Sequence, residues 1–348
     1  MTDIVIVGAG MAGVSLAAAL APHAAVILIE AEARPGYHST GRSAAFWSES
    51  YGGPLIQPLT TASGPFLREH GFLSPRGAIH LADAKGEAAL SALAAQLGEV
   101  PMQALDRAAL EAAVPGLRPG WNRGLAEPSC ADIDVAALHA FYLRGLQVVT
   151  DARLLRARRE RRWRIETTAG AFEADVLVNA AGAWADAVAE RCAAAPLGIR
   201  AYRRTIAQLR IDPPAPAGLP LVVDASGRFY FKPEAGGRLW LSPHDETPCD
   251  PCDCAPEELD VAIAIDRLEQ AVDWRVERVE HAWAGLRSFA PDRLPVYGFG
   301  APGFFWCAGQ GGFGIQTAPA ASQMAAALLL GDPPGIDPAP YAAERFGR

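Results

Sequence analysis

The stretch that decides the fold reads Asp-Ile-Val-Ile-Val-Gly-Ala-Gly-Met-Ala-Gly over residues 3–13. Its first half is a short apolar run, typical of a buried strand in a parallel sheet. Three glycines follow in the spacing that opens a helix in dinucleotide-binding folds. We expect Gly8 to allow the tight turn, Gly10 to let a pyrophosphate approach the backbone, and Gly13 to let the helix pack on the strand.

The residues after this turn complete the same pattern. An Ala- and Leu-rich helix begins at Met11 and Ala12, and its N-terminus offers N–H groups and a partial positive charge to phosphates. A second apolar run ends in Glu30, followed by Ala31, about 20 residues past the central glycine, where an acid binds a ribose hydroxyl. This order of elements predicts a dinucleotide site. The alternative is a glycine-rich turn that binds nothing.

Length and composition bound the class of protein. A chain of 348 residues fits two domains, or one large α/β unit with insertions. Half of the residues are hydrophobic and 20% are charged, as in an ordinary globular enzyme. The net charge of −8 argues against a nucleic-acid partner. Because neither a signal-peptide pattern nor a membrane-spanning apolar stretch is present, we expect a cytoplasmic protein without stable membrane insertion.

The six cysteines are scattered, apart from Cys249, Cys252 and Cys254 in the run Cys-Asp-Pro-Cys-Asp-Cys. Such a triplet has ligands that suit zinc. A second pair of ligands is missing, however, and prolines and acids flank the triplet. These neighbours favour an exposed turn, so we predict no metal.

The pattern changes along the chain. The stretch 75–119 has helical periodicity without nucleotide-binding signals, and the α/β signature returns over 145–190. Residues 200–245 alternate in several short runs, which indicates an antiparallel sheet. An apolar strand at 304–309 then leads into a glycine turn at 310–314 and an Ala-rich helix. A glycine turn before a helix therefore occurs near both ends of the chain.

These segments predict an α/β protein with two domains. The first is a Rossmann-like FAD-binding domain built from three discontinuous segments, 1–76, 132–192 and 283–348. An inserted α+β substrate-binding domain, with a mainly antiparallel sheet, is expected over 77–131 and 193–282. Nicotinamide dehydrogenases usually have one contiguous cofactor domain, whereas FAD proteins more often assemble the site from separated pieces. This organisation favours FAD.

Several blocks of sequence occur in the same order in one known family. They are residues 8–13, 35–45, 131–134, 138–139, 142–145, 176–184, 283–289 and 310–317. On these blocks the chain resembles the FAD-dependent D-amino-acid oxidase and dehydrogenase family, and within it the bacterial D-arginine dehydrogenases. The resemblance covers nearly the whole chain. It implies non-covalent FAD, but it does not fix the substrate.

The resemblance also implies which residues hold the cofactor. The small-residue loop Ser39, Thr40, Arg42 and Ser43 is able to lie on an isoalloxazine face, with Arg42 neutralising phosphate. Ala44 and Ala45 are implied near flavin N5, where small side chains keep the hydride path clear. The backbone of Val149 is expected to meet the adenine, with plain strand core as the alternative.

Two later segments complete the implied cofactor site. Ala181, Gly182 and Trp184 let the chain pass the pyrophosphate. The C-terminal glycine turn opens a helix whose positive end can stabilise negative charge on the reduced flavin, although a purely structural turn is the alternative. The residues implied there are Arg287, Gly311, Gly312, Phe313, Gly314, Ile315, Gln316 and Thr317.

Oxidation of an amino acid requires a neutral amine and hydride transfer from the α-carbon to flavin N5, after which the imine hydrolyses to a 2-oxo acid and ammonia. The main task of the protein is orientation, and an arginine fork is the best clamp for a carboxylate. By resemblance, Arg204 and Arg287 hold the substrate carboxylate and Tyr230 and Tyr51 add hydroxyls, while the carbonyl of Gly312 accepts from the amine. Plain roles in ion pairs or in the core are the alternatives for these side chains.

Departures from the D-arginine enzymes point to a different substrate. Ala78 matches the acid that grips the guanidinium there, and Phe46, Trp47 and Ser48 match a histidine, its neighbour and a threonine. A pocket that loses a negative charge and gains aromatic surface penalises a buried guanidinium. We therefore predict apolar D-amino acids as substrates, unless Glu49 points inward and restores a basic preference.

Other functions remain open at this point. The first is FAD-dependent oxidation of secondary amines such as sarcosine, or of 2-hydroxy acids, for which Cys307 is the nearest candidate for a covalent flavin link. A tRNA-modifying flavoenzyme and a flavin-binding protein without turnover are the others, and the acidic charge argues against the former. The electron acceptor is expected to be a quinone or other respiratory carrier, or oxygen.

Overall fold

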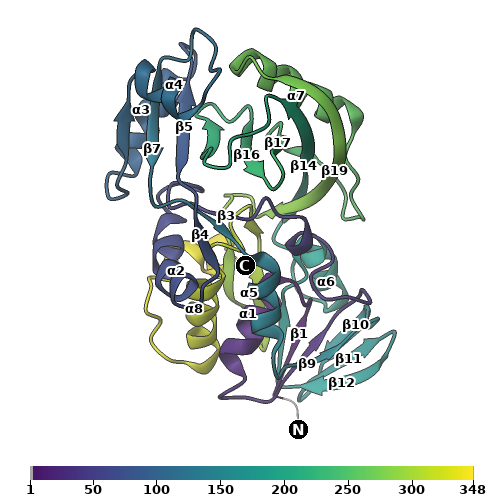
Figure 1. Ribbon diagram of the computed structural model, residues 1–348. Coiled ribbons are helices and arrows are strands. Elements are labelled where there is room, and N and C mark those ends of the chain that lie inside the picture. The colour runs from purple at the N-terminus through teal and green to yellow at the C-terminus, as the bar shows by residue number, and fades with distance from the viewer. Residues whose placement is uncertain (1–2, 348) are drawn as a thin grey trace.

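The computed structural model describes residues 3–347, and its elements form two regions with a small sheet between them (Figure 1). The lower region in Figure 1 contains the first strand and the last long helix of the chain. The upper region contains the two longest strands, β14 (Arg200–Asp212) and β19 (Arg275–Phe289).

The lower region is built on a six-stranded sheet with the order β20-β21-β13-β1-β2-β9. Strand β1, the first of the chain, pairs in parallel with β13 on one side and with β2 on the other. Neighbouring strands thus come from the beginning, middle and end of the chain, as predicted for a domain built from discontinuous segments. The strands are β1 (Ile4–Val7), β2 (Val26–Ile29), β9 (Gln147–Val149), β13 (Val176–Asn179), β20 (Val296–Ala301) and β21 (Phe304–Ala308).

The first strand shows why this sheet is buried on both faces. Successive side chains of a strand point to opposite sides. Ile4 and Ile6 lie in the core formed with the helices α1, α5 and α8, whereas Val5 and Val7 lie in a second core on the other face. A continuous apolar run is the expected pattern for such a strand.

Helices cover both faces of the six-stranded sheet. On one face α1 packs against α5 and α8, and α2 packs on α8. On the other face α6 contacts β13. Across residues 3–347, no helix combines the length and apolarity needed to cross a membrane. The helices are α1 (Met11–Leu20), α2 (Gln57–Glu69), α5 (Val135–Leu143), α6 (Ala185–Arg191) and α8 (Ala318–Leu330).

A three-stranded antiparallel sheet lies beside α6 (Figure 1). Its strands are β10 (Leu154–Arg159), β11 (Trp163–Thr167) and β12 (Gly170–Ala174). The indole of Trp163 donates a hydrogen bond to the Gly303 carbonyl at 2.7 Å, which ties this sheet to the loop before β21.

The upper region is one large sheet with the order β22-β19-β14-β17-β16-β15-β5-β7-β6, and β18 pairs with β14. Only β15 and β5 pair in parallel among these neighbours, so the sheet is mainly antiparallel, as predicted. The remaining strands are β5 (Ala78–Ala82), β6 (Gln103–Leu105), β7 (Arg123–Glu127), β15 (Leu221–Asp224), β16 (Tyr230–Glu234), β17 (Arg238–Ser242), β18 (Thr247–Pro248) and β22 (Gln310–Gly311).

A small sheet, β3-β8-β4, lies between the two regions (Figure 1). The predicted domain boundaries stay a prediction, and the one at 283 falls inside β19. The other elements are β3 (Phe46–Trp47), β4 (Leu73–Pro75), β8 (Ala131–Ile133), α3 (Glu87–Gln96), α4 (Arg107–Ala113), α7 (Glu258–Ala271), η1 (Thr40–Arg42), η2 (Gly182–Trp184), η3 (Ala339–Tyr341) and η4 (Ala343–Phe346).

Candidate functional site

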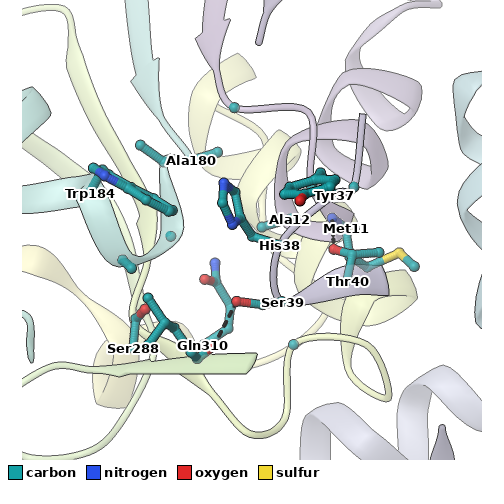
Figure 2. A pocket seen from close by; sticks show the side chains of 18 of the residues that line it. Met11, Ala12, Tyr37, His38, Ser39, Thr40, Ala180, Trp184, Ser288 and Gln310 are labelled. Atoms are coloured by element: carbon teal, nitrogen blue, oxygen red, sulfur yellow. Dashed lines mark hydrogen bonds between the residues drawn. The ribbon is translucent and has the colours of Figure 1, made fainter. Parts of the chain in front are cut away.

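A cavity of about 340 Å³ opens where β1, β2 and β13 end, beside the first turn of α1 (Figure 2). The carboxyl edge of parallel strands is where open α/β sheets bind ligands. Most of the predicted cofactor-binding residues line this cavity. They are Gly8, Gly10, Met11, Ala12, Glu30, Ala31, Ser39, Thr40, Arg42, Ser43, Ala44, Ala181, Gly182, Trp184, Arg287, Gly311, Gly312, Gly314 and Ile315.

The glycines of the first turn have separate roles. A Cβ on Gly13 would lie 1.9 Å from the carbonyl oxygen of Gly8, so only glycine lets α1 pack against the turn. Gly8 has a φ of +103°, and a Cβ there would lie 2.5 Å from the Ala180 oxygen. At Gly10 the nearest atom to a Cβ would be Thr40 Oγ1, at 3.4 Å. Gly10 therefore leaves room at the cavity, whereas Gly13 does not line it and serves packing.

Glu30 has the position that the sequence predicts. It follows β2 and lines the cavity. Its Oε2 accepts a hydrogen bond from the Ala9 N–H at 2.8 Å, and its Oε1 accepts from the Glu32 N–H at 3.0 Å. Two backbone donors thus hold the carboxylate at the cavity wall, where it is able to accept hydrogen bonds from a sugar.

The loop around η1 is tied to both regions of the molecule. Thr40 Oγ1 accepts from the Met11 N–H at 2.9 Å, a bond drawn in Figure 2. Ser39 Oγ donates to the carbonyl of Leu286 in β19 at 2.6 Å. The loop therefore bridges the start of α1 and the large sheet, and its small side chains form part of the cavity wall.

Arg42 lines the cavity, as predicted, and also has partners within the protein. Its Nη1 donates to the carbonyls of Cys254 and Ala284 at 2.8 and 3.2 Å, and its Nη2 pairs with the Asp253 carboxylate. Arg42 therefore holds the segment around residue 253, and its contact with phosphate stays a prediction.

Two predicted cofactor-binding residues of the C-terminal turn, Gln316 and Thr317, form hydrogen bonds within the protein. The side-chain amide of Gln316 donates to the Tyr51 carbonyl at 3.0 Å and to Thr60 Oγ1 at 2.9 Å, and accepts from the Ser48 N–H at 3.3 Å. Thr317 Oγ1 donates to the Phe313 carbonyl at 2.8 Å. Both side chains are buried, and neither lines the cavity. Their hydrogen bonds stabilise the surrounding structure.

Four other predicted residues also lie outside the cavity lining. Trp47 is 1% exposed, and its indole donates to the Thr60 carbonyl, so it belongs to the core and not to the pocket. The Val149 carbonyl accepts from the Glu30 N–H, so that part of its backbone is not free for an adenine. The Ala45 carbonyl likewise accepts a hydrogen bond from the Ile133 N–H. The Phe313 ring packs on the rings of Tyr51 and Phe289.

The cavity also has lining residues that sequence reasoning missed. Tyr37 and His38 bring aromatic rings into it, and the His38 ring lies 4.6 Å from the Trp184 ring between centroids (Figure 2). Arg153 and Arg191 add positive charge at the wall. The signal for the two aromatic residues was their place in the block 35–45, from which the prediction took only the small residues and Arg42.

The register of β14 and β19 brings the two predicted clamp arginines together. Arg204 pairs with Gly285, and Tyr202 pairs with Arg287. Cross-strand partners share a face, and so do residues two apart along a strand, so Arg204 and Arg287 lie on one face of the sheet. Both line the cofactor cavity. Arg203 lies on the opposite face, where it pairs with Asp260 at 2.9 Å.

Arg204 is held with part of its guanidinium unpaired. Its Nε donates to the Asp245 carbonyl at 2.7 Å and its Nη2 to Glu246 Oε1 at 3.1 Å. Its Nη1 is buried and has no hydrogen-bond partner among the described residues. Burial and the neighbouring charge of Arg287 lower the pKa of Arg204. The group is therefore a buried cation with one donor available to an anion.

Arg287 and Tyr51 form the other half of this site. Arg287 Nη1 donates to the Tyr51 hydroxyl. Burial raises the pKa of Tyr51, but the charges of Arg287 and Arg204 and the hydrogen bond from Arg287 outweigh it, so the pKa lies below its ordinary value. A Cβ on Gly312 would lie 2.7 Å from both Arg287 Nη1 and Tyr51 Oη. Only glycine lets the C-terminal turn approach the two side chains.

Tyr230 completes the predicted set. Its ring is 3% exposed, and its hydroxyl has no hydrogen-bond partner within residues 3–347. Phe46 lies edge-on to Tyr230 and to Tyr51, with centroids 5.9 and 5.1 Å apart. Ala78 is buried in the same small cluster as Tyr230 and Ala44. The predicted substrate residues Phe46 and Ala78 thus lie beside the tyrosines.

A second cavity of about 320 Å³ has Tyr51 in its wall, and the Tyr51 hydroxyl accepts from Arg287, which lines the first cavity. Apolar side chains from α3 and β15 form much of its wall, together with Phe46 and two histidines, His80 and His244. Burial and the charges of Arg204 and Arg287 lower the pKa of His244 to about 2, so this ring is neutral at physiological pH. The histidines are sites that sequence reasoning missed, and they carried no spacing signal.

A buried acid that the prediction also missed lies behind this cavity. Glu127 is fully buried and accepts hydrogen bonds from the hydroxyls of Ser48 and Ser50 and from the Glu49 N–H at 2.7 Å. Its Oε2 lies 3.4 Å from His80 Nε2. Glu49 itself points away and accepts from the Thr61 hydroxyl. Asp224 lines the second cavity itself, and its carboxylate accepts from Arg228 Nε and Nη2 at 2.7 and 2.8 Å. Both acids therefore already have partners, and Ser48 is one of those of Glu127.

Cys307 is a core residue. It is 2% exposed, and burial raises the pKa of its thiol to about 12. Its side chain does not line the cofactor cavity, because β21 buries it against α1. This position argues against a covalent flavin link at Cys307.

Comparison with known proteins shows which protein family the chain matches. The family described as FAD dependent oxidoreductase matches residues 3–328. A glycine oxidase of Pseudomonas aeruginosa is 31% identical over 249 residues, which cover 66% of this chain and 65% of that protein. A glycine oxidase of Pseudomonas putida is 26% identical over 337 residues, which cover 86% and 82%. These relatives do not include a D-arginine dehydrogenase, so that finer likeness is not supported.

Solved structures share the fold. Glycine oxidase from Geobacillus kaustophilus has a TM-score of 0.85 at 24% identity and covers 98% of both chains. L-Proline dehydrogenase from P. horikoshii has a TM-score of 0.85 at 20% identity and covers 100% of this chain and 98% of that one. The likeness confirms the predicted fold class. The family match identifies FAD as the cofactor.

Proposed function

The chain belongs to the family of FAD-dependent oxidoreductases, and from this premise we propose that it oxidises free amino acids, preferring apolar D-amino acids. When bound, FAD accepts the hydride that leaves the α-carbon of the substrate. The resulting imine hydrolyses in water to a 2-oxo acid and ammonia. What the chain contributes is the position of the substrate and the electrostatics around it.

One observation carries the proposal. Two arginines on one sheet face converge at the cofactor cavity, and the buried Arg204 Nη1 and Tyr230 hydroxyl lack partners among the described residues. Buried polar groups without partners are costly. A substrate carboxylate between Arg204 and Arg287 would satisfy them, because a guanidinium binds a carboxylate with charge-assisted hydrogen bonds.

The surrounding groups support a neutral amine beside this clamp. The charges of Arg204 and Arg287, which together with burial keep His244 uncharged, also disfavour a cationic amine, and the uncharged His244 is no source of a proton for it. The nearby Gly312 carbonyl is the acceptor proposed for the amine. We propose that the neutral amine is selected from solution or is formed when solvent removes its proton.

The second cavity supports an apolar side chain on the substrate. It adjoins the clamp at Tyr51, and its apolar wall comes from α3, β15 and Phe46. Asp224 lines this cavity but already pairs with Arg228 through two hydrogen bonds. Glu127 accepts from Ser48, Ser50 and the Glu49 N–H, so neither acid is free to bind a guanidinium. D-Arginine is therefore a poor substrate on this proposal. The D configuration rests on the family resemblance.

The relatives favour a second candidate, because two of them are glycine oxidases. Glycine has the carboxylate that the clamp requires and leaves the second cavity empty. Secondary amines such as sarcosine have the same carboxylate. The cavity of about 320 Å³ beside the clamp is the reason to rank side chains larger than hydrogen first.

Anaerobic mixing with a substrate panel tests these proposals. The FAD-loaded enzyme would be mixed with D- and L-leucine, D- and L-methionine, D-arginine, glycine, sarcosine and 2-hydroxy acids, and loss of the flavin absorbance followed. Rapid reduction by D-leucine and D-methionine, with inert L-isomers, is the expected result. A higher kcat/KM for D-arginine than for D-leucine would refute the apolar preference, and reduction by glycine or sarcosine alone would favour the second candidate.

Three further expectations accompany this function. The FAD is proposed to be non-covalent, which acid precipitation tests, since a free cofactor leaves with the supernatant. The electron acceptor is a quinone or other respiratory carrier, or oxygen, and comparison of turnover with each decides between them. The cytoplasmic location stays a prediction from the sequence.

A further inference from the structure

The loop 249–254 brings three cysteines together at the rim of the cofactor cavity. The sulfur atoms of Cys249, Cys252 and Cys254 all lie within 4.8 Å of one another. The Cys249 and Cys252 sulfurs are 3.6 Å apart. The triplet is thus a convergent set of thiols, although its flanking residues favoured an exposed turn without metal.

These spacings suit one tetrahedral ion. Two sulfurs that each lie about 2.3 Å from the same Zn²⁺ ion are separated by about 3.8 Å. The observed separations require only small side-chain movements to reach this value. Cys252 is exposed and Cys249 is half-buried, so an ion has a route from solvent and room for a water ligand.

The fold holds both ends of the loop from outside. The Cys249 N–H donates to the Ala201 carbonyl of β14 at 3.0 Å. Cys254 is buried in a cluster with Ala284 and Leu286 of β19, and its carbonyl accepts from Arg42 Nη1 at 2.8 Å. The ligands are therefore positioned before an ion arrives, which lowers the cost of ordering them.

We propose that Cys249, Cys252 and Cys254 bind one Zn²⁺ ion, with the fourth position open to water. Deprotonated thiolates are the ligands, so each that binds releases its proton to solvent. The site is independent of the substrate proposed above. The proposed role is structural, because none of the three cysteines lines the cofactor cavity, whereas the loop contacts the lining residue Arg42 through Asp253 and Cys254.

These contacts give the ion a function in holding the cofactor. Asp253 accepts from the Tyr37 hydroxyl at 2.9 Å and pairs with Arg42, and both of these residues line the cofactor cavity. An ion bound to the residues on either side of Asp253 restrains this acid and hence the cavity rim. Removal of the ion is expected to speed the release of FAD.

Metal analysis of the full-length FAD-loaded enzyme tests the site. After purification under reducing conditions and dialysis against metal-free buffer, we expect one zinc per chain. Cobalt substitution should give the intense sulfur-to-cobalt absorption of a tetrahedral thiolate site. Cys252→Ser should lose both signals, since the residue is exposed and the variant should fold. Cys192→Ser alters a buried cysteine outside the loop and should keep both.

Failure of the reduced enzyme to take up zinc or cobalt would overturn the proposal. A Cys249–Cys252 disulfide in the isolated enzyme, with no metal uptake after reduction, would overturn it as well. The link to the cofactor has its own readout. A chelator should speed FAD release several-fold in the parent enzyme and have no effect in Cys252→Ser, whereas equal rates with and without zinc would refute the link.

Discussion

Arg204 and Arg203 are adjacent in sequence yet have opposite surroundings. The strand alternation places Arg204 on the cavity face, whereas Arg203 pairs with Asp260 on the other face. The unpaired Nη1 of Arg204 and the contact of Arg287 with Tyr51 make the first face an anion site. At the scale of single residues, the proposed chemistry thus depends on which side of a strand a cation occupies.

Arg287→Ala should lower kcat/KM for an amino-acid substrate by about 10- to 100-fold, mainly through KM, because a hydrogen bond to a charged group contributes about 1.5–3 kcal/mol. Steady-state kinetics with the best substrate of the panel measures it. Arg203→Ala is the matched control and should lose stability with little change in kcat/KM. Equal losses in the two variants would contradict the clamp.

Tyr51 should give the enzyme an alkaline limit. Its pKa is lowered because the charges of Arg287 and Arg204 outweigh burial. Above that pKa the phenolate competes with the substrate carboxylate for Arg287, so KM should rise with pH. In Tyr51→Phe this rise should disappear, as measured by the pH profile of KM. An unchanged alkaline limb in the variant would exclude Tyr51 as its source.

At the scale of elements, the turn between β1 and α1 separates two uses of glycine. The Cβ of an alanine at Gly13 would collide with the Gly8 carbonyl, whereas at Gly10 it would be in ordinary contact with Thr40. The first glycine therefore serves the packing of two elements, and the second leaves space for the cofactor.

Gly13→Ala should lower the free energy of unfolding of the apoprotein by about 1–3 kcal/mol, the usual cost of overpacking. Gly10→Ala should change it little and weaken FAD binding instead. Denaturant unfolding of the apoproteins and FAD titration measure the two effects. If both variants lost the same amount of stability, the packing role given to Gly13 would be wrong.

At the scale of the whole molecule, buried polar groups join the two regions. Glu127 ends β7 of the large sheet, and its carboxylate accepts from Ser48 and Ser50, which follow β3 of the small sheet. Burial raises the pKa of Glu127, but the hydrogen bonds with His80, Ser50 and Ser48 outweigh it and leave the pKa below its ordinary value. The carboxylate is therefore charged and held by its neighbours.

Glu127→Gln should destabilise the protein at neutral pH by about 1.5–3 kcal/mol, the contribution of hydrogen bonds to a charged group. Because the folded pKa is lowered, this stabilisation is present above the unfolded pKa of about 4.3 and is lost as pH falls through the folded value. Unfolding measured from pH 7 downward should show a shallower acid decline in the variant. An identical decline would contradict the assignment.

Short-range patterns were sufficient for much of the fold. The strand, glycine turn and acid at residues 3–30 were predicted correctly, because local sterics and hydrophobic periodicity dictate them. The discontinuous cofactor region and the mainly antiparallel second sheet were also predicted. The sequence did not indicate the hydrogen-bond partners of Arg42, Trp47 and Gln316, because these partners come from elsewhere in the chain.

The functional contacts depended on the long-range fold. The register of β14 against β19 puts Arg204 beside Arg287, and the pairing of β18 with β14 places Cys249 against Ala201. Glu127 carried no local signal, because its partners follow a different strand. Local sequence specifies dihedral angles and burial period, and these suffice for a nucleotide turn. Contacts between distant segments are set by the packing of whole sheets, so the juxtaposition of the two arginines and the surroundings of the buried acid emerge only in the assembled molecule.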